Sequence, residues 1–121
     1  MQVVVVSPPG RKRDNLLTML ESIDLLDSIK TAETCDDVIN TVDSSNPATV
    51  MIDYRYPDTG MEKEVGKLIM NDGVNHIVLL QTRNAPRTHF THYTTSEVVF
   101  DELSVGILNN LLKNIYLETA V

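Results

Sequence analysis

The chain has 121 residues, of which 42% are hydrophobic and 22% are charged, as expected of one globular domain spanning 1–121. Ten Lys and Arg against seventeen Asp and Glu give a formal net charge of -7, which opposes the phosphate neutralisation that dominates nucleic-acid binding, so we expect no direct contact with nucleic acid. A single cysteine and the lack of an apolar run of roughly 18 residues predict a cytoplasmic protein that does not enter the membrane.

The first third of the chain alternates between strand and helix patterns. Val3–Val6 is a continuous run of valines, which is typical of a strand buried on both faces of a parallel sheet. Leucines and an isoleucine at helical spacing predict a helix over 11 to about 23, and 28–32 is a weaker strand candidate. Thr34, with Asp37 three residues later, has the spacing of a capping box, so we expect a second helix to begin there.

The rest of the chain repeats this alternation. Strands are predicted at 48–52, 76–80 and 97–100, and helices at 61–70 and after a capping Ser104. Asn71, Asp72 and Gly73 form a typical stop between a helix and the next strand. The segment 86–96, rich in Thr and His, shows neither the helical nor the strand period, so we expect a short or irregular connection with a shortened fourth helix there.

Strict alternation of strands and helices in a chain of this length predicts an α/β fold, because each crossover between parallel strands is right-handed and covers the sheet. We expect a flavodoxin-like (βα)5 doubly wound parallel sheet with the strand order 2-1-3-4-5. Ligands of such sheets bind at the carboxyl ends of the strands, where the strand order reverses. The residues delivered to this edge are 7–9, 53–60, 81–83 and 101–102.

Four residues at this edge carry a resemblance to a known family. Asp53 ends the third predicted strand, Pro57 and Gly60 follow it at fixed spacing, and Thr82 ends the fourth strand. Along essentially its whole length, the chain resembles the receiver domain of bacterial two-component response regulators. The resemblance implies that Asp53 matches the phospho-accepting aspartate and Thr82 the hydroxyl residue that follows the phosphoryl group in the switch. Pro57 and Gly60 would shape the loop before the third helix.

Three other features of the family, at four positions, are missing in this chain. The acidic pair that holds Mg²⁺ in the family reads Ser7 and Pro8, and the lysine at the end of the fifth strand reads Phe100. The aromatic switch position reads Val98. Without the metal and the lysine, phosphoryl transfer loses its main electrostatic stabilisation. We therefore interpret the chain as a degenerate receiver, or pseudo-receiver, that is not an enzyme and holds no metal or cofactor.

The resemblance also implies a role and partners. The role is that of a receiver-like regulatory domain in two-component phosphorelay signalling and transcription regulation, acting by protein–protein interaction without phosphorylation. The partners are a second copy of the chain, bound through helix four, strand five and helix five, and a C-terminal output domain or a histidine kinase. The predicted last helix carries more apolar side chains than one sheet face would bury, namely Ile107, Leu108, Leu111, Leu112, Ile115 and Leu117.

Two alternatives stay open at this point. The first is an active phosphoacceptor, phosphorylated on Asp53, with Mg²⁺ held by unusual acidic ligands drawn from Asp58, Glu62, Asp101 and Glu102. The second is a sensor that binds a small ligand in the switch-point crevice. In the leading interpretation, a nearby cation would pair with Asp53 in place of the metal, and the candidates are Arg11, Lys12 and Arg83.

Other chemistry-bearing residues have simpler explanations. His89 and His92 lie in a polar stretch without a third metal ligand nearby, so we expect a solvated loop. Cys35 at a helix start is interpreted as an ordinary small residue. His76 lies at the opposite end of strand four from Thr82, so no histidine is placed to activate a hydroxyl as a nucleophile.

Overall fold

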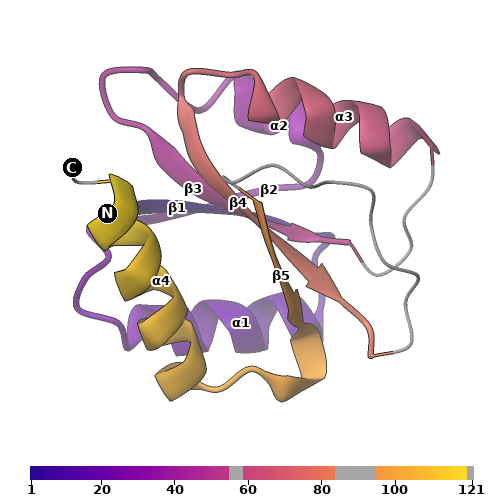
Figure 1. The fold of residues 1–121 in the computed structure, drawn as a ribbon. Helices are drawn as coiled ribbons and strands as arrows, with labels where there is room; N and C mark the ends of the chain where they lie inside the picture. The colour runs from indigo at the N-terminus through magenta and orange to yellow at the C-terminus, as the bar shows by residue number, and fades with distance from the viewer. Residues whose placement is uncertain (55–58, 84–94, 120–121) are drawn as a thin grey trace.

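A five-stranded parallel sheet forms the centre of the structure, a computed structural model that describes residues 1–54, 59–83 and 95–119 (Figure 1). The strand order is β2-β1-β3-β4-β5, and each neighbouring pair is parallel. The strands are β1 (Gln2–Val6), β2 (Ser28–Ala32), β3 (Ala48–Asp53), β4 (Val74–Gln81) and β5 (Thr95–Val99). The predicted flavodoxin-like fold and its strand order are therefore confirmed.

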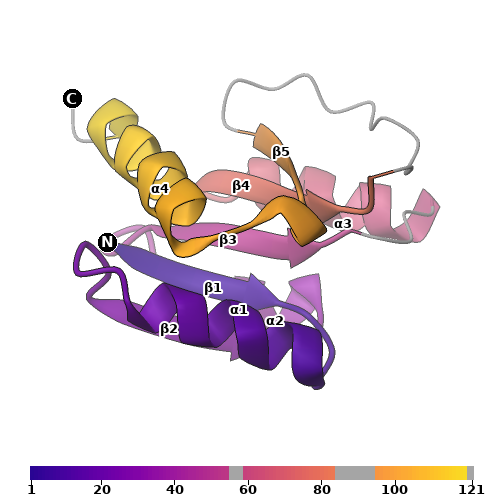
Figure 2. The ribbon, with the colours of Figure 1, turned by 90° about the horizontal axis from the view of Figure 1, so that it is seen from below.

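Helices cover both faces of the sheet. They are α1 (Arg11–Glu21), α2 (Cys35–Ile39), α3 (Thr59–Ile69) and α4 (Val105–Thr119), with a short 3-10 helix η1 (Phe100–Glu102) before α4. Helices α2 and α3 lie on one face, and α1 and α4 lie on the other (Figures 1 and 2). Among the described helices, none combines the length and the apolarity that crossing a bilayer requires.

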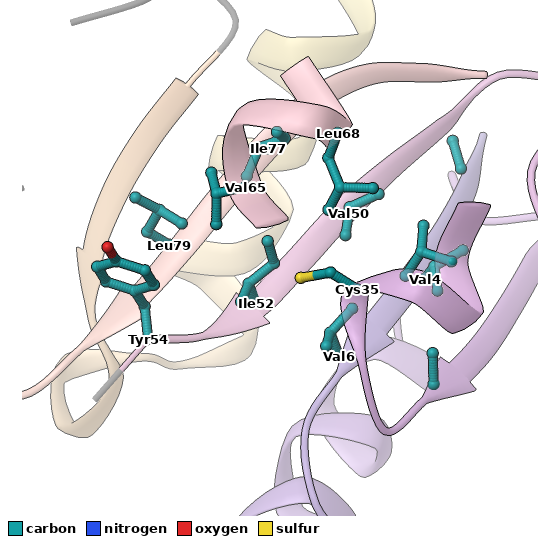
Figure 3. Close-up of a cluster of buried hydrophobic side chains, with 13 residues drawn as sticks. Val4, Val6, Cys35, Val50, Ile52, Tyr54, Val65, Leu68, Ile77 and Leu79 are labelled. Atoms are coloured by element: carbon teal, nitrogen blue, oxygen red, sulfur yellow. The ribbon is translucent and has the colours of Figure 1, made fainter. Parts of the chain in front are cut away.

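The valines of β1 show how the sequence specifies a sheet with two covered faces. Val4 and Val6 belong to a cluster with residues of α2 and α3, which Figure 3 shows together with Val50 and Ile52 of β3. Val3 and Val5 belong to a second cluster on the opposite face, with residues of α1 and α4. Because neighbouring side chains of a strand point to opposite faces, a run of four apolar residues is buried only where both faces are covered.

Side chains predicted to cap the helices do so. The Oγ1 atom of Thr34 accepts a hydrogen bond from the backbone N–H of Asp37 at 3.2 Å, and the Oγ atom of Ser104 accepts one from Ile107 at 3.2 Å. After α3, the Oδ1 atom of Asn71 accepts a hydrogen bond from the N–H of Gly73 at 2.8 Å. The first two bonds satisfy backbone donors that the helix starts would leave without partners, and the third closes the turn after α3.

Several predicted boundaries are wrong by a few residues. Helix α1 ends at Glu21, because the next residues turn back with the N–H of Ile23 donating to the carbonyl of Leu20. Helix α3 begins at Thr59, so Gly60 lies in its first turn and not in the loop before it. Such ends depend on local backbone hydrogen bonds, which the spacing of apolar side chains does not report.

The last strand also differs from its prediction. It begins at Thr95, since Thr95 and Ser96 pair with Ile77 and Val78 of β4, so these two residues do not belong to the irregular connection predicted over 86–96. The strand ends at Val99, and Phe100 begins η1. The remaining part of that segment, 86–94, lies outside the described residues.

The stability of the fold is expected to depend on pH through His76, near the start of β4. This side chain is only 4% exposed and forms a 2.7 Å hydrogen bond between its Nε2 atom and the Oγ atom of Ser96. Burial lowers the pKa of His76 below the ordinary 6.5, and Glu118 opposes this shift. The folded state therefore binds fewer protons than the unfolded state, so the stabilisation by neutral His76 is present above pH 6.5 and is lost as the pH falls.

The measurement is chemical denaturation between about pH 7.5 and pH 5. We expect the free energy of unfolding of the wild type to fall more steeply toward low pH than that of His76→Gln, which cannot titrate in this range. Groups shared by both proteins cancel in the comparison. Equal pH dependence of the two proteins would show that His76 does not resist protonation in the fold.

Candidate functional site

Two of the predicted site residues meet at the carboxyl edge of the sheet. Asp53 is the last residue of β3, and Ser7 follows β1, the neighbouring strand. The hydroxyl of Ser7 is placed to donate a hydrogen bond to the Oδ2 atom of Asp53 at 3.2 Å. The backbone N–H of Ser7 donates to the carbonyl of Ala32 in β2 at 3.1 Å, and the N–H of Tyr54 donates to Leu80 in β4 at 2.9 Å. Backbone hydrogen bonds to β2 and β4 thus hold Ser7 and Asp53 in position.

A cavity of about 230 Å³ opens at this edge, between the ends of β1 and β3 and the helices α2 and α3. It is lined by Val6, Ser7, Pro8, Glu33, Thr34, Cys35, Ile52, Asp53, Met61 and Glu64. Figure 3 shows the sulfur of Cys35 directed toward Ile52, with Val6 beside them. The cavity lies where β1 is flanked by β2 on one side and β3 on the other, which is the point where the strand order reverses.

The charges of this cavity have one sign. Asp53, Glu33 and Glu64 all line it, and its described lining contains no Lys or Arg. The two glutamates were not among the residues predicted for the site. Each glutamate has a position in the sequence that could have predicted it. Glu33 directly follows β2, the neighbour of β1. Glu64 shares a helix face with Met61, three residues before it, and Leu68, four residues after it.

The thiol of Cys35 is buried at the base of this acidic cavity. Its side chain is 2% exposed, and burial, followed by the charges of Glu64 and Asp36, raises its pKa to about 12. A thiol with so high a pKa is protonated at neutral pH and is a poor nucleophile. Its chemistry agrees with the interpretation of Cys35 as an ordinary small residue.

Lys12 and Arg83, two of the three basic residues considered as partners of Asp53, make other contacts. The Nη2 atom of Arg83 lies 3.4 Å from Glu102 Oε1 in an ion pair with both side chains largely exposed. The Nζ atom of Lys12 lies 5.7 Å from the centroid of the Phe100 ring, within the range of a cation–π interaction. At the position where the resemblance implies a lysine, the chain thus holds an aromatic ring with a lysine from α1 over it.

The other predicted positions are spread over the same edge. Thr82 is half-buried directly after β4, and Val98 is half-buried in β5. Among the alternative acidic ligands, the described Glu62, Asp101 and Glu102 do not line the cavity. Pro57, Asp58, His89 and His92 lie outside the described residues.

The residues at the strand ends do not fit a Mg²⁺ ion. Mg²⁺ requires near-octahedral oxygen ligands, commonly one or two carboxylates with several waters. At the family's acidic positions, Ser7 offers a hydroxyl that already faces Asp53, and Pro8 offers no side-chain oxygen. Within the described ranges, no group of three or more His, Cys, Asp or Glu side chains is arranged to hold a metal.

The chain matches no protein-family model, and no curated protein is significantly similar to it. A function for this chain therefore has to rest on its fold and on the geometry of this edge of the sheet.

Proposed function

We propose that the chain is a receiver-like regulatory domain of a cytoplasmic two-component response regulator, acting by protein–protein interaction without phosphorylation of Asp53. The observation that supports this proposal best is the position of Asp53. It ends the central strand β3 of a 2-1-3-4-5 sheet, next to Ser7, where the resemblance implies a phosphoacceptor next to an acidic pair.

The electrostatics of the cavity supports the second half of the proposal. Phosphorylation of Asp53 would replace one negative charge by about -1.5 to -2. Two further carboxylates, Glu33 and Glu64, line the same cavity. In phosphoryl transfer, metal ions and cationic side chains stabilise the developing charge, and Ser7, Pro8 and Phe100 carry no charge to do so. The negative charge of the cavity therefore disfavours phosphorylated Asp53, which is the product that a receiver would form.

The first test is incubation of the protein with acetyl phosphate and Mg²⁺, followed by intact-mass spectrometry. We expect no phosphoryl adduct on the wild type and no difference between it and Asp53→Asn. A thermal melt with and without Mg²⁺ should give the same midpoint, because an ion stabilises a fold only when it binds. An adduct on the wild type that Asp53→Asn lacks would overturn the proposal and favour an active phosphoacceptor.

The second test addresses the receiver-like part. The triple variant Ser7→Asp, Pro8→Asp, Phe100→Lys restores the family's acidic pair and lysine, so we expect it to bind Mg²⁺ and to take up phosphate on Asp53. A matched control, Ser7→Asn, Pro8→Asn, Phe100→Met, has side chains of similar size without the new charges. If the folded triple variant binds Mg²⁺ no better than this control, the alignment with the receiver family is wrong.

We further propose that the domain forms a homodimer through a surface that includes β5 and α4, which are the predicted strand five and helix five, while a C-terminal output domain or a histidine kinase is its other partner. The predicted helix four of this surface lies outside the described residues. Ile107 of α4 is 49% exposed and lines a hollow of about 280 Å³ with Val98 and Val99 of β5. Apolar side chains of two neighbouring elements thus share one exposed surface. Contact with a second copy would remove them from water.

Sedimentation of the protein at a concentration of about 50 μM tests the dimer, since association depends on protomer concentration. We expect the wild type to sediment at twice the mass of the monomer, and Ile107→Glu to sediment as a monomer. Met70→Glu is the matched control: Met70 is 82% exposed, but it directly follows α3, which lies on the opposite face of the sheet from α4 (Figure 1). A monomeric wild type would refute the dimer.

A further inference from the structure

We propose that the 230 Å³ cavity at the switch point binds a small organic cation, with an ammonium or guanidinium group carried on a short apolar chain. The carboxylates of Glu33 and Glu64 would hold the charged group, and the apolar wall would contact the chain. This inference goes beyond the proposed function, because it involves neither phosphorylation nor Mg²⁺.

The size of the cavity sets the size of the ligand. Its volume of about 230 Å³ corresponds to about eight water molecules, at roughly 30 Å³ each in the liquid. Sites for drug-sized ligands are larger, at about 300–1,000 Å³. A chain of a few carbon atoms with one polar end group therefore fits, whereas a nucleotide or a sugar phosphate does not.

The carboxylates determine the charge of the ligand. Glu33 follows β2 and Glu64 lies on α3, so two separate elements place acidic side chains on one cavity. Neither glutamate has an ion-pair partner within the described parts of the chain. Glu64 also contributes to the raised pKa of Cys35, which indicates that its negative field reaches the base of the cavity. A cation in this space would be attracted by both carboxylates, whereas an anion would be repelled.

The remaining polar groups of the cavity are already engaged. The Oγ1 atom of Thr34 accepts a hydrogen bond from the N–H of Asp37, and the Ser7 hydroxyl faces Asp53. Within the described lining, the glutamate oxygens are therefore the acceptors that remain for a ligand with several N–H donors. An ammonium group offers three such donors and a guanidinium group five.

The walls of the cavity favour an organic cation over a hydrated metal ion. Val6, Pro8, Ile52 and Met61 present carbon or thioether groups to the space. A chain of methylene groups gains free energy when such surfaces remove it from water, whereas a hydrated ion makes no use of them. A cationic group on an apolar chain has two sources: a free small amine, and a lysine or arginine side chain of a protein partner.

Titration of the full chain with n-butylamine, followed by isothermal calorimetry and by the melting temperature, tests the site. We expect saturable binding and a higher melting temperature with n-butylamine, and neither effect with n-butanol, which has the same chain without the charge. Nα-acetyl-lysine methylamide then distinguishes the two sources. Weaker binding than n-butylamine indicates a free amine as the ligand, and equal or tighter binding indicates a protein side chain.

Variants locate the binding. Glu33→Gln and Glu64→Gln are each expected to weaken n-butylamine binding about tenfold, because each removes a charge-assisted hydrogen bond. Glu62→Gln is the matched control, since Glu62 lies on the same helix but does not line the cavity. Absence of saturable binding, equal binding of n-butanol, or unchanged binding by both cavity variants would overturn the proposal. So would a response to MgCl₂ that n-butylamine does not reproduce.

Discussion

Replacing Leu112 of α4 with alanine is expected to lower the free energy of unfolding by about 2–5 kcal/mol, the range for removing a leucine from a packed core. The side chain of Leu112 is fully buried and belongs to the cluster that joins α4 to Val3 and Val5 of β1. Its truncation removes apolar contacts and leaves a cavity that the strands cannot fill, because the backbone of a five-stranded sheet relaxes little.

The matched control is Leu117→Ala in the same helix. Leu117 is 56% exposed, so its truncation should change the free energy of unfolding by no more than about 0.5 kcal/mol. Urea denaturation of the three proteins measures both effects, with equal slopes if only stability changes. A similar loss for both variants would mean that α4 does not pack on the sheet by the face formed by Leu108, Leu112 and Ile115.

The second large effect is expected at Gly73, in the turn between α3 and β4. A Cβ atom at this position would lie 2.9 Å from Val42 Cγ2, 3.0 Å from the backbone nitrogen of Asp43 and 3.1 Å from Asn71 Oδ1. The turn cannot move freely, because the carbonyl of Gly73 accepts a hydrogen bond from the N–H of Ala48 at 2.9 Å. We therefore expect Gly73→Ala to destabilise the fold by about 1–3 kcal/mol, as overpacking does elsewhere.

The same substitution at Gly66, Gly66→Ala, is expected to stabilise the fold. Gly66 lies within α3, and no heavy atom of the described residues would come within 4 Å of its added Cβ. Alanine favours a helix interior over glycine, so this variant should gain about 0.5–1 kcal/mol. Thermal and urea denaturation compare both glycine variants with the wild type. A Gly73→Ala protein as stable as the wild type would show that the turn can open without cost.

The fold could be predicted from the sequence because strong local patterns agreed with the topology rules. The valine run of β1 requires cover on both faces, and the alternation of elements restricts the connections to right-handed crossovers. The caps at Thr34 and Ser104 were predictable for the same reason, since each is a contact within one turn of the chain. The start of β5 could not be predicted in this way, because it is the pairing with β4 that makes Thr95 and Ser96 part of the strand.

Only part of the candidate site could be predicted from the sequence. Asp53 and Ser7 follow from the rule that parallel strands deliver their carboxyl ends to one edge. The glutamates of the cavity lie outside the four segments that were assigned to this edge from the sequence: Glu33 directly follows β2, and Glu64 lies on a face of α3. The contacts of Arg83 with Glu102 and of Lys12 with Phe100 depend on side-chain directions that spacing along the chain does not specify.

The burial of β1 between distant parts of the chain has a consequence for folding kinetics. Val3 and Val5 are covered by α4, which follows them by about 100 residues, and the two edges of β1 pair with β2 and β3. Such non-local contacts form only after large loops close, so folding should be slow relative to a helical bundle of equal length. Until then, the four valines are an exposed β-prone segment, and partly folded chains are at risk of intermolecular strand pairing.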